Sequence, residues 1–452
     1  MIARPWFWLF GLLLCGGGML PAAAEVATVD AVRFRNFGIS SGLSQVTARA
    51  LMQDEQGFMW IGTQDGLNRF DGYNFRVYQR DRRDPSSLGD NHITALARGD
   101  QGTLWVGTMA GGLNRLDPAT DEIVAFRHRD TDSRSLAADG VFALIRLGNG
   151  KLWVATSGGA LQQLAAGAEH FETIEPGVEL GIIRSMVQAS NGDIWLGGSR
   201  GLWRHRSADG SWRQIAPDDA DLGDLQAVAV DAAGDVWAGT TRSGLIRVSA
   251  SGEVRARYRN GAGGDGVLPD DQVRALLVTR AGQVWVGTMN GVATYQEAGD
   301  SFLTWRYDAG DAGSPAGNRI ASFFEDRDGL IWIGTWTGGF SIHNPATQAV
   351  RLIRNHGRDR TSLPASPVRA LWMDADGSLW MGVMEGGGLV HYDLEQGVLQ
   401  RWVHDPNDPA SLSGNVVQGI ARTPDGQLWI GTQGAGLARM RADGSGFDHF
   451  RR

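Results

Sequence analysis

The chain has 452 residues, of which 42% are hydrophobic and 20% are charged, as in an ordinary globular protein. Asp and Glu outnumber Lys and Arg by 50 to 42, and the formal net charge of −8 argues against nucleic acid or an anionic membrane surface as a partner. Glycine is abundant at 64 residues while proline stands at 14, which favours many tight turns between short strands over disorder.

The first 24 residues have the pattern of an export signal. Arg4 precedes an apolar stretch that runs from Trp6 to Leu14, and the small run Ala22–Ala24 provides an A-x-A cleavage site before Glu25. The apolar stretch is too short for a normal membrane span. We therefore expect residues 1–24 to be a signal peptide that is cleaved near Ala24, and the exported chain to be periplasmic.

The one cysteine of the chain, Cys15, lies inside this segment. A lipoprotein signal needs a small residue before its cysteine, and Leu14 is not small, so ordinary cleavage is favoured over lipidation. The cleaved chain then has no disulfides, and its core depends on packing alone. No second apolar stretch of spanning length follows in the sequence.

After this segment, one sequence unit recurs nine times. Each unit has a tryptophan, a glycine three residues before it and an apolar residue nine before it, and successive tryptophans are 42 to 49 residues apart. The nine are Trp60, Trp105, Trp153, Trp195, Trp237, Trp285, Trp332, Trp380 and Trp429. A fixed period of this length indicates one supersecondary unit stacked many times.

Each unit contains the signals of four short strands. Asp-Gly or Asn-Gly pairs predict a two-residue hairpin turn before a second strand such as Leu104–Val106. Gly stands two residues after the tryptophan in eight units and Ala155 in the third, which lets a neighbouring backbone come close. A third strand such as Leu67–Phe70 and an aromatic-rich fourth such as Phe75–Tyr78 or Phe302–Trp305 complete the unit.

Four antiparallel strands in fewer than about fifty residues predict one blade of a β-propeller. Helical repeats would show an apolar period near 3.6, and leucine-rich repeats are shorter than these units. The predicted fold class is therefore all-β, a β-propeller built of nine four-stranded blades. The nine tryptophans are interpreted as packing residues between blades and not as part of a cofactor site.

Residues 42–72 resemble the opening of a two-component regulator propeller. The resemblance lies in Gly42-Leu43-Ser44-Gln45 and in the strand Trp60-Ile61-Gly62-Thr63, and the loop 405–413 resembles the usual inter-blade loop of that family. It extends over roughly residues 32–450, because both patterns recur in register. Units four and five depart most: Trp195–Gly198 lacks the threonine, and their inter-blade loops are short.

The resemblance implies a periplasmic sensor. Such propellers usually come in pairs of seven blades each, followed by a small sandwich domain, a membrane helix and a cytoplasmic histidine kinase or diguanylate cyclase. In well-known members the ligands are glycans or their breakdown products. The sequence contains no kinase, diguanylate cyclase or DNA-binding motif. We therefore expect the output module, the membrane helix and any homodimer contact through a downstream domain to lie outside this chain.

The family's number of blades predicts how the nine units are grouped. We expect residues 32–355 to form a first propeller of seven blades, and residues 356–452 to form two further blades of an incomplete second propeller. One nine-bladed ring is the alternative. The segment Phe34–Phe37 resembles a fourth strand that precedes the first unit, and a spare outer strand can cover an edge that would otherwise be exposed.

Residues for catalysis or metal binding do not emerge from the sequence. The nine histidines are scattered, no His or Cys pair has metal-ligand spacing, and Asp-Gly runs are usually plain turns. No G-x-S-x-G motif is present. We therefore predict no catalytic residue, no metal and no cofactor.

Ligand binding is predicted where the loops gather around the channel on one face of the propeller. Trp336 places a bulky ring where other units have Gln64 or Met109, and beside Arg319 it is suited to stack on a sugar and pair with an acidic group. The alternatives are purely structural: Trp336 packs against a neighbouring loop, and Asn91 and Asn318 fix their turns. The candidate ligand-binding residues are Trp336, Arg319, Asn318, Asn91, His92 and Glu385.

The leading hypothesis for function is a non-enzymatic, periplasmic ligand-sensing module of a two-component-type regulator. The expected ligand is a small molecule or a glycan fragment, bound across several blades so that it shifts the geometry or dimer packing of a downstream domain. A propeller enzyme that acts on polysaccharide and an extracytoplasmic protein-interaction scaffold are the alternatives.

Overall fold

The computed structural model describes residues 34–216, 218–261, 267–346, 353, 362–364, 366–394 and 397–451. The chain divides into two compact units, one of residues 31–350 and one that contains residues 351–452, and each is described by itself. The predicted signal peptide and the predicted boundary between residues 355 and 356 lie outside the described residues. Within the described ranges, no helix is long and apolar enough to cross a membrane.

The described residues form nine four-stranded antiparallel sheets, and this confirms the predicted all-β propeller fold of nine four-stranded blades. Short 3-10 turns at η1 (Ile39–Ser41), η2 (Ala220–Leu222) and η3 (Glu297–Gly299) supplement the strands. In eight sheets the four strands follow chain order, so each strand pairs with the next one along the chain. The remaining sheet takes its outer strand from the other end of its unit.

The unit of residues 31–350 contains seven sheets. The first four are β2 (Ala50–Gln53), β3 (Met59–Thr63), β4 (Gly66–Phe70) and β5 (Phe75–Tyr78); β6 (Ile93–Arg98), β7 (Leu104–Thr108), β8 (Leu113–Leu116) and β9 (Ile123–Phe126); β10 (Val141–Arg146), β11 (Leu152–Thr156), β12 (Leu161–Leu164) and β13 (Glu172–Thr173); and β14 (Ile183–Gln188), β15 (Ile194–Gly198), β16 (Gly201–His205) and β17 (Trp212–Ile215).

The other three sheets of this unit complete the set of seven. They are β18 (Leu225–Val230), β19 (Val236–Thr240), β20 (Leu245–Val248) and β21 (Val254–Tyr258); β22 (Val273–Val278), β23 (Val284–Thr288), β24 (Gly291–Gln296) and β25 (Ser301–Trp305); and β26 (Ile320–Glu325), β27 (Ile331–Thr335) and β28 (Phe340–His343) with β1 (Phe34–Phe37).

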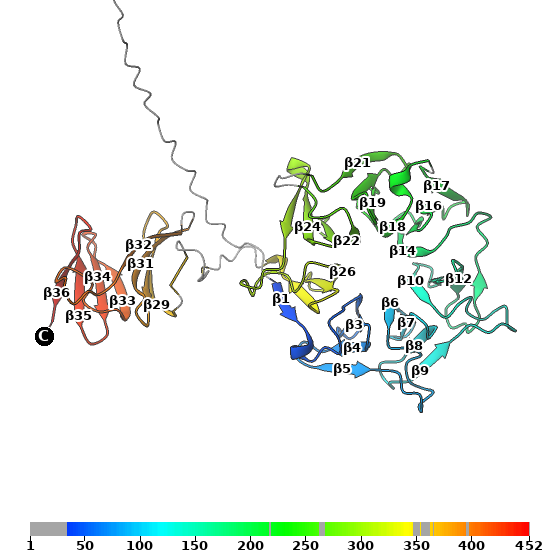
Figure 1. Ribbon diagram of the computed structural model, residues 1–452, viewed down its shortest axis with the longest axis horizontal. Coiled ribbons are helices and arrows are strands. Elements are labelled where there is room, and N and C mark those ends of the chain that lie inside the picture. The colour runs from blue at the N-terminus through cyan, green and yellow to red at the C-terminus, as the bar shows by residue number, and fades with distance from the viewer. Residues whose placement is uncertain are drawn as a thin grey trace, which may run out of the picture. The chain divides into compact units, whose positions relative to one another are not determined.

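The seven sheets of this unit surround a common centre, as Figure 1 shows. Their first strands contact one another in cyclic order: β2, β6, β10, β14, β18, β22, β26 and again β2. The seventh sheet is completed by β1, which pairs antiparallel with β28 from Phe34 opposite His343 to Phe37 opposite Phe340. The two ends of this unit's chain are therefore joined within one sheet.

In the unit of residues 31–350, the tryptophans of the repeat connect each sheet to the next one around the ring. Trp60 has no exposed surface and packs among Leu88, Ile93 and Leu104, which belong to the second sheet and the loop before it. Trp332 of the seventh sheet makes the same contact against Leu51 and other residues of the first sheet. We call this boundary between the seventh and first sheets the join. The interpretation of these residues as packing between blades is consistent with such contacts.

The glycine two residues after the tryptophan makes room for the next sheet. A Cβ atom on Gly107 would lie 2.8 Å from Cγ1 of Val141, a side chain on the first strand of the third sheet. At Gly334 the obstacle is backbone, because a Cβ atom would lie 2.1 Å from the carbonyl oxygen of Ala48. The predicted close approach of backbone therefore occurs at the join, whereas at Gly107 the neighbour is a side chain.

The turn before the tryptophan differs from the predicted two-residue hairpin in the first sheet, whereas in the second sheet Gln101 and Gly102 both have the predicted positive φ, at 54° and 81°. In the first sheet it runs from Asp54 to Phe58, and Gly57 has a positive φ of 98° while Gln56 does not. The reason is the side chain of Asp54, whose Oδ1 accepts the backbone N–H groups of Gln56 and Phe58 at 3.0 and 2.9 Å. Its Oδ2 accepts the indole N–H of Trp60 at 2.7 Å, so the same carboxylate fixes the turn and the tryptophan.

The first and second sheets are also joined at their outer edges by a tyrosine. The hydroxyl of Tyr78 donates to Oδ1 of Asp121 at 2.6 Å, and Arg76 forms an ion pair with the other oxygen at 2.6 Å. Burial, and next this hydrogen bond to Asp121, raise the pKa of Tyr78 to about 12. Ionisation of Tyr78 is therefore less favourable in the folded chain than in the unfolded chain, where the pKa is about 10.

We expect Tyr78→Phe to destabilise the 31–350 unit by about 1.5 kcal/mol at pH 7, because it removes a hydrogen bond to a charged group that is partly exposed. The stabilisation is complete below pH 10 and is lost as the pH rises through about 12. Urea unfolding of both proteins across this range tests it, with Tyr73→Phe at an 88% exposed position as the control. A stability difference that stays constant from pH 9 to pH 12 would contradict the assignment.

The unit that contains residues 351–452 has two sheets. They are β29 (Val368–Met373), β30 (Leu379–Val383), β31 (Gly388–Asp393) and β32 (Gly397–Trp402), and β33 (Val417–Arg422), β34 (Leu428–Thr432), β35 (Gly436–Met440) and β36 (Phe447–Phe450).

Each of these two sheets leaves one face uncovered within its unit. Leu371, on the first strand of the eighth sheet, is 64% exposed, while its counterpart Leu51 in the ring is 9% exposed. Trp429 of the ninth sheet is only partly buried, and the nearest atoms to a Cβ built on Gly431 lie 3.8 Å away. The face toward a preceding sheet and the face toward a following sheet are the ones left open.

Candidate functional site

A cavity of about 270 Å³ lies where the first strands of the seven sheets meet. Every sheet of the ring contributes one residue to it, eleven positions before its tryptophan, and the second and seventh sheets each add the residue that follows their second strand. We call this space the channel cavity. Its lining is Arg49, Thr94, Phe142, Arg184, Gln226, Arg274 and Ala321, together with Met109 and Trp336.

The lining residues point to the centre because the strand pairing is interrupted there. In six of the seven sheets the register shifts by one residue at this position, as between Ile93 and Ala95 on either side of Thr94. A bulge of this kind leaves one residue unpaired and redirects its side chain. In the first sheet, Ala48 instead donates its N–H to Thr335 of the seventh sheet at 2.9 Å.

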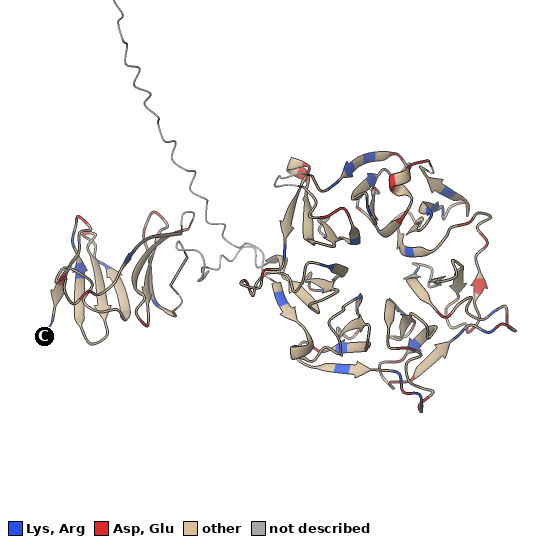
Figure 2. Ribbon diagram, viewed as in Figure 1, with Lys and Arg blue, Asp and Glu red and all other residues tan. Residues whose placement is uncertain are grey.

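The channel cavity is rich in arginine. Arg49, Arg184 and Arg274 line it, and Arg319 stands one residue before the first strand of the seventh sheet, close enough to influence Arg274. Figure 2 shows basic segments on the inner strands β14 and β22, beside the centre of the ring. The carboxylate of Asp224 lies nearby, forms an ion pair with Arg184 and accepts the hydroxyl of Thr241 at 3.1 Å.

Three of these arginines have no such partner. Across the described ranges of the chain, Arg49, Arg274 and Arg319 form no ion pair with any carboxylate. Burial, and next the charge of Arg274, lower the pKa of Arg49. Burial, and next the charges of Arg319 and Arg184, lower the pKa of Arg274. The arginines therefore repel one another in a partly desolvated space.

Trp336 occupies one wall of the channel cavity, at the join between the seventh and first sheets. Its backbone N–H donates to the carbonyl of Arg319 at 2.8 Å, and its carbonyl accepts the hydroxyl of Thr47 at 3.1 Å. The guanidinium carbons of Arg49 and Arg274 lie 5.7 and 5.4 Å from the centroid of its indole ring. The indole Nε1 is buried and has no hydrogen-bond partner among the residues that the structure describes.

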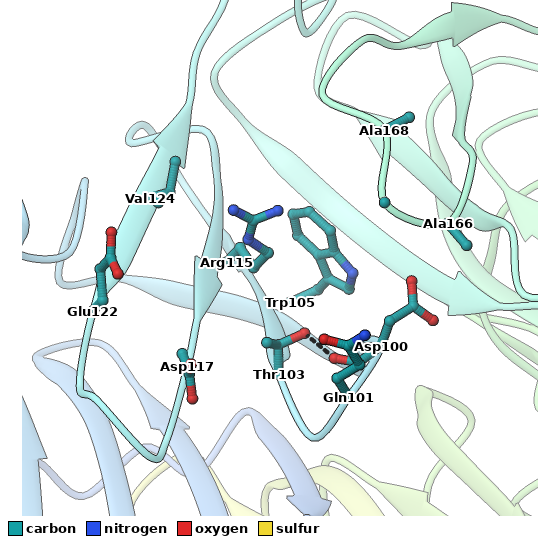
Figure 3. A pocket seen from close by; sticks show the side chains of 11 residues that line it. Asp100, Gln101, Thr103, Trp105, Arg115, Asp117, Glu122, Val124, Ala166 and Ala168 are labelled. Carbon is teal, nitrogen blue, oxygen red and sulfur yellow. Dashed lines mark hydrogen bonds between the residues drawn. The ribbon is translucent and has the colours of Figure 1, made fainter.

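A larger cavity, of about 550 Å³, lies between the turns of the second and third sheets (Figure 3). Trp105 and Arg115 lie next to each other on its wall, and Asp117 and Glu122 come from the adjoining β8–β9 turn. Asp100 is already paired with Arg146, and Asp117 accepts the backbone N–H of its own turn. This cavity draws on two sheets, whereas the channel cavity draws on all seven, so the channel cavity is the stronger candidate for a ligand site.

Five segments of the chain match the family model described as two component regulator propeller. They are residues 42–65, 87–110, 267–290, 314–337 and 411–434, which fall in the first, second, sixth, seventh and ninth sheets. The chain carries two component regulator propeller repeats. Arg49, Arg274, Arg319 and Trp336 all lie inside the matched repeats.

Solved structures similar to these repeats include extracellular domains of two hybrid two component systems from B. thetaiotaomicron. The first is 21% identical with a TM-score of 0.70, and the chain covers 55% of it; the second is 20% identical with a TM-score of 0.57, and the chain covers 54% of it. In each case 93% of the present chain is covered. The chain thus spans just over half the length of these domains, and the likeness is one of fold.

Two further similarities are narrower. A stretch of 55 residues is 42% identical to histidine kinase P4 of Formosa agariphila, which amounts to 12% of this chain and 4% of the kinase. Virginiamycin B lyase from Staphylococcus aureus is 12% identical with a TM-score of 0.52, and the match covers 69% of this chain and 98% of the lyase. The lyase similarity shows a shared propeller fold.

Three of the six residues predicted to bind a ligand gather at or next to the channel cavity. Trp336 lines it, and Arg319 adjoins it through Arg274. His92 lies with its Nε2 3.4 Å from Nη1 of Arg49. Burial, and next the charge of Arg49, lower the pKa of His92, which favours its neutral imidazole.

Asn91 and Asn318 each form a side-chain to backbone hydrogen bond that recurs in other sheets. Oδ1 of Asn91 accepts the backbone N–H of Arg80 at 2.7 Å, and Oδ1 of Asn318 accepts that of Tyr307 at 2.7 Å. In each case the donor stands eleven residues earlier, at the start of the inter-blade loop. Asp139, Asp271 and Asn415 make the same bond in other sheets. These contacts match the turn-fixing alternative.

Glu385 is not among the residues around the channel cavity. It lies in the loop between β30 and β31, in the unit that contains residues 351–452, and has a positive φ of 48°. The arginines at 49, 184 and 274 were missing from the sequence prediction. The signal that could have revealed them is the position eleven residues before each tryptophan, which every sheet of the ring uses to line the channel cavity.

Proposed function

We propose that this chain is the extracytoplasmic, ligand-sensing part of a two-component-type signal transduction regulator, and that it is not an enzyme. The ligand is a small molecule or a glycan fragment that binds in the channel cavity. Its binding changes the geometry or the packing of a downstream module, which a ligand can do only through different affinities for the two arrangements.

The observation that carries the proposal is the combination of regulator propeller repeats with a cavity to which all seven sheets contribute. A ligand in such a place contacts every blade at once, so its binding is coupled to the arrangement of the whole ring. The extracellular domains with a similar fold support an extracytoplasmic location, and the sequence pattern of residues 1–24 supports export.

A thermal-shift screen of the purified chain against neutral and acidic mono- and oligosaccharides tests ligand sensing. A ligand present at about one hundred times its Kd adds about 2.7 kcal/mol of stability, which is a readily measured rise in melting temperature. Trp336→Ala is expected to weaken binding by about tenfold or more, because it removes an aromatic wall of the channel cavity. Met289→Ala is the matched control, since it occupies the same place in the sixth sheet but does not line the cavity.

Two results would contradict the proposal. If no compound of either kind raises the melting temperature, ligand sensing by this chain is wrong. If chromatography of the incubated saccharides shows turnover by the purified chain, the non-enzymatic assignment is wrong and the polysaccharide enzyme is favoured.

A further inference from the structure

We propose that the channel cavity binds an anionic group, a carboxylate or a sulfate, carried by a small organic molecule or by an acidic residue of a glycan. This inference rests on the proposed ligand sensing and names the chemical class of its ligand. Three features of the cavity support it: its unpaired arginines, its excess of hydrogen-bond donors and its size.

The unpaired arginines of the channel cavity contrast with two other partly buried arginines of the ring, Arg204 and Arg247. Arg204 pairs with Asp193 at 2.5 Å, and Arg247 pairs with Asp235 at 2.9 Å. Two further partly buried arginines, Arg69 and Arg115, have no ion pair among the described residues and lie instead over the rings of Phe58 and Phe126. Arg49 and Arg274 are partly buried as well, yet no described carboxylate forms an ion pair with either. The chain has a net charge of −8, so a cluster of positive side chains without carboxylate partners indicates that a ligand supplies the negative charge.

The polar groups that face the channel cavity are mainly donors. Guanidinium groups carry five N–H donors and no acceptor, and the indole of Trp336 has one donor. That indole N–H is buried and has no acceptor among the described residues, which is costly unless a ligand provides one. The hydroxyl of Thr94 is already used, because it donates to the carbonyl of Val141. A carboxylate or sulfate offers only acceptors and therefore matches this lining.

Trp336 lies where the charged guanidinium groups and the indole N–H donor can contact the same ligand. Arg49 and Arg274 each lie within 6 Å of its ring centroid, so an anion held between their guanidinium groups would lie beside the indole. The volume of about 270 Å³ is that of about nine water molecules in the liquid, which suits one acidic sugar residue or a small organic acid. Phe142 and Met109 provide apolar surface for the uncharged part of such a ligand.

The first experiment uses inorganic sulfate as the probe and needs no knowledge of the natural ligand. Melting temperatures are measured in sodium sulfate and in sodium chloride at matched ionic strength. The proteins are the parent chain, the double variant R49Q/R274Q and the control R82Q, which removes one exposed arginine from an inter-blade loop. Sulfate stabilises all three by its exclusion from protein surfaces, so the informative quantity is the difference between proteins.

We expect an extra stabilisation by sulfate in the parent and in R82Q that is absent from R49Q/R274Q. At low ionic strength in chloride, the double variant is expected to melt no lower than the parent, because the mutual repulsion of the two guanidinium groups is gone. That comparison also shows that the variant folds. Equal stabilisation by sulfate in all three proteins would overturn the inference.

The second experiment separates the two anion types and distinguishes this inference from the proposed function. Isothermal titration calorimetry compares galacturonate, sulfated galactose and neutral galactose. At least one acidic sugar is expected to bind about tenfold more tightly than galactose. W336F, which keeps an aromatic ring of smaller size but lacks the N–H donor, is expected to weaken that binding.

Binding of galactose as tight as that of both acidic sugars would overturn the anion inference and leave ligand sensing in place. If none of the three sugars binds and sulfate has the same effect on every protein, the anion inference is wrong. If, in addition, the saccharide screen described above shows no ligand, the proposed function is wrong as well.

Discussion

A chain that begins at Gly38, and therefore lacks β1, is expected to lose most of the stability of its seven-sheet unit. Phe34 and Phe37 are buried, with 4% and 8% of their surface exposed, and the ring of Phe37 stacks on Phe340 at a centroid distance of 5.0 Å. Replacing one buried phenylalanine by alanine costs about 3–5 kcal/mol, while a whole domain is stable by about 5–15 kcal/mol. Thermal unfolding followed by circular dichroism measures the loss.

The deletion acts at a point that joins the two ends of the unit. Phe37 also contacts Phe70 of the first sheet, at a centroid distance of 5.2 Å, so β1 packs against both the seventh and the first sheets. Without it, β28 presents an unpaired edge, which favours aggregation. Phe37→Ala alone is expected to cost about 3–5 kcal/mol, and Ile39→Ala, at a 59% exposed position, less than about 0.5 kcal/mol. A chain starting at Gly38 that melts with the parent would show that β1 contributes nothing to closure.

The strand pattern of this protein was predictable from local sequence because each blade repeats the same chemistry. The glycine, tryptophan and small-residue positions locate three strands in every unit, and Phe34–Phe37 is recognisable as an outer strand from its own residues. Its partner is not recognisable in this way. The pairing of Asn36 with Ser341 joins residues from opposite ends of the unit, and only closure of the ring brings them together.

Details of individual blades escaped prediction where a side chain overrides the general pattern. The turn after β2 is longer than the predicted two-residue hairpin because the carboxylate of Asp54 binds two N–H groups within it. The outer strand of the third sheet is only Glu172–Thr173 and contains no aromatic residue. Phe171, just before that strand, is buried at 3% exposure and supplies the aromatic packing there instead.

The sequence predicted some residues of the candidate site, such as Trp336, but missed the arginines that line it, and the difference has a physical reason. Trp336 stands out because it breaks a position that other units fill with smaller side chains. Arg49, Arg184 and Arg274 do not stand out, since the equivalent position in the other sheets of the ring holds Thr, Phe, Gln or Ala. A variable position in a repeat resembles an ordinary loop residue. Arg49 and Arg274 form one cluster only because the ring brings the first and sixth sheets to the same cavity.

The second large effect is expected from Trp332→Ala, which should destabilise the 31–350 unit by about 3–5 kcal/mol. Trp332 is 4% exposed and packs against Leu51 and Ile61 of the first sheet. Its indole N–H donates to Oδ2 of Asp326 at 2.8 Å, so the substitution also leaves that buried carboxylate with one donor fewer. Urea unfolding, followed by hydrogen exchange in peptides from residues 31–350, measures the change.

Trp429→Ala provides the matched comparison, because it changes the same position of the repeat in a sheet that has no following sheet in its unit. Trp429 is only partly buried, and its ring contacts Phe450 of its own sheet at a centroid distance of 5.1 Å. We expect a clearly smaller loss of stability, measured by hydrogen exchange in peptides from residues 397–451. Equal losses at the two positions would mean that a tryptophan of the repeat stabilises mainly its own sheet. The cohesion of the ring would then have to come from other contacts between sheets, such as those made by Tyr78 and by the aromatic residues of β1.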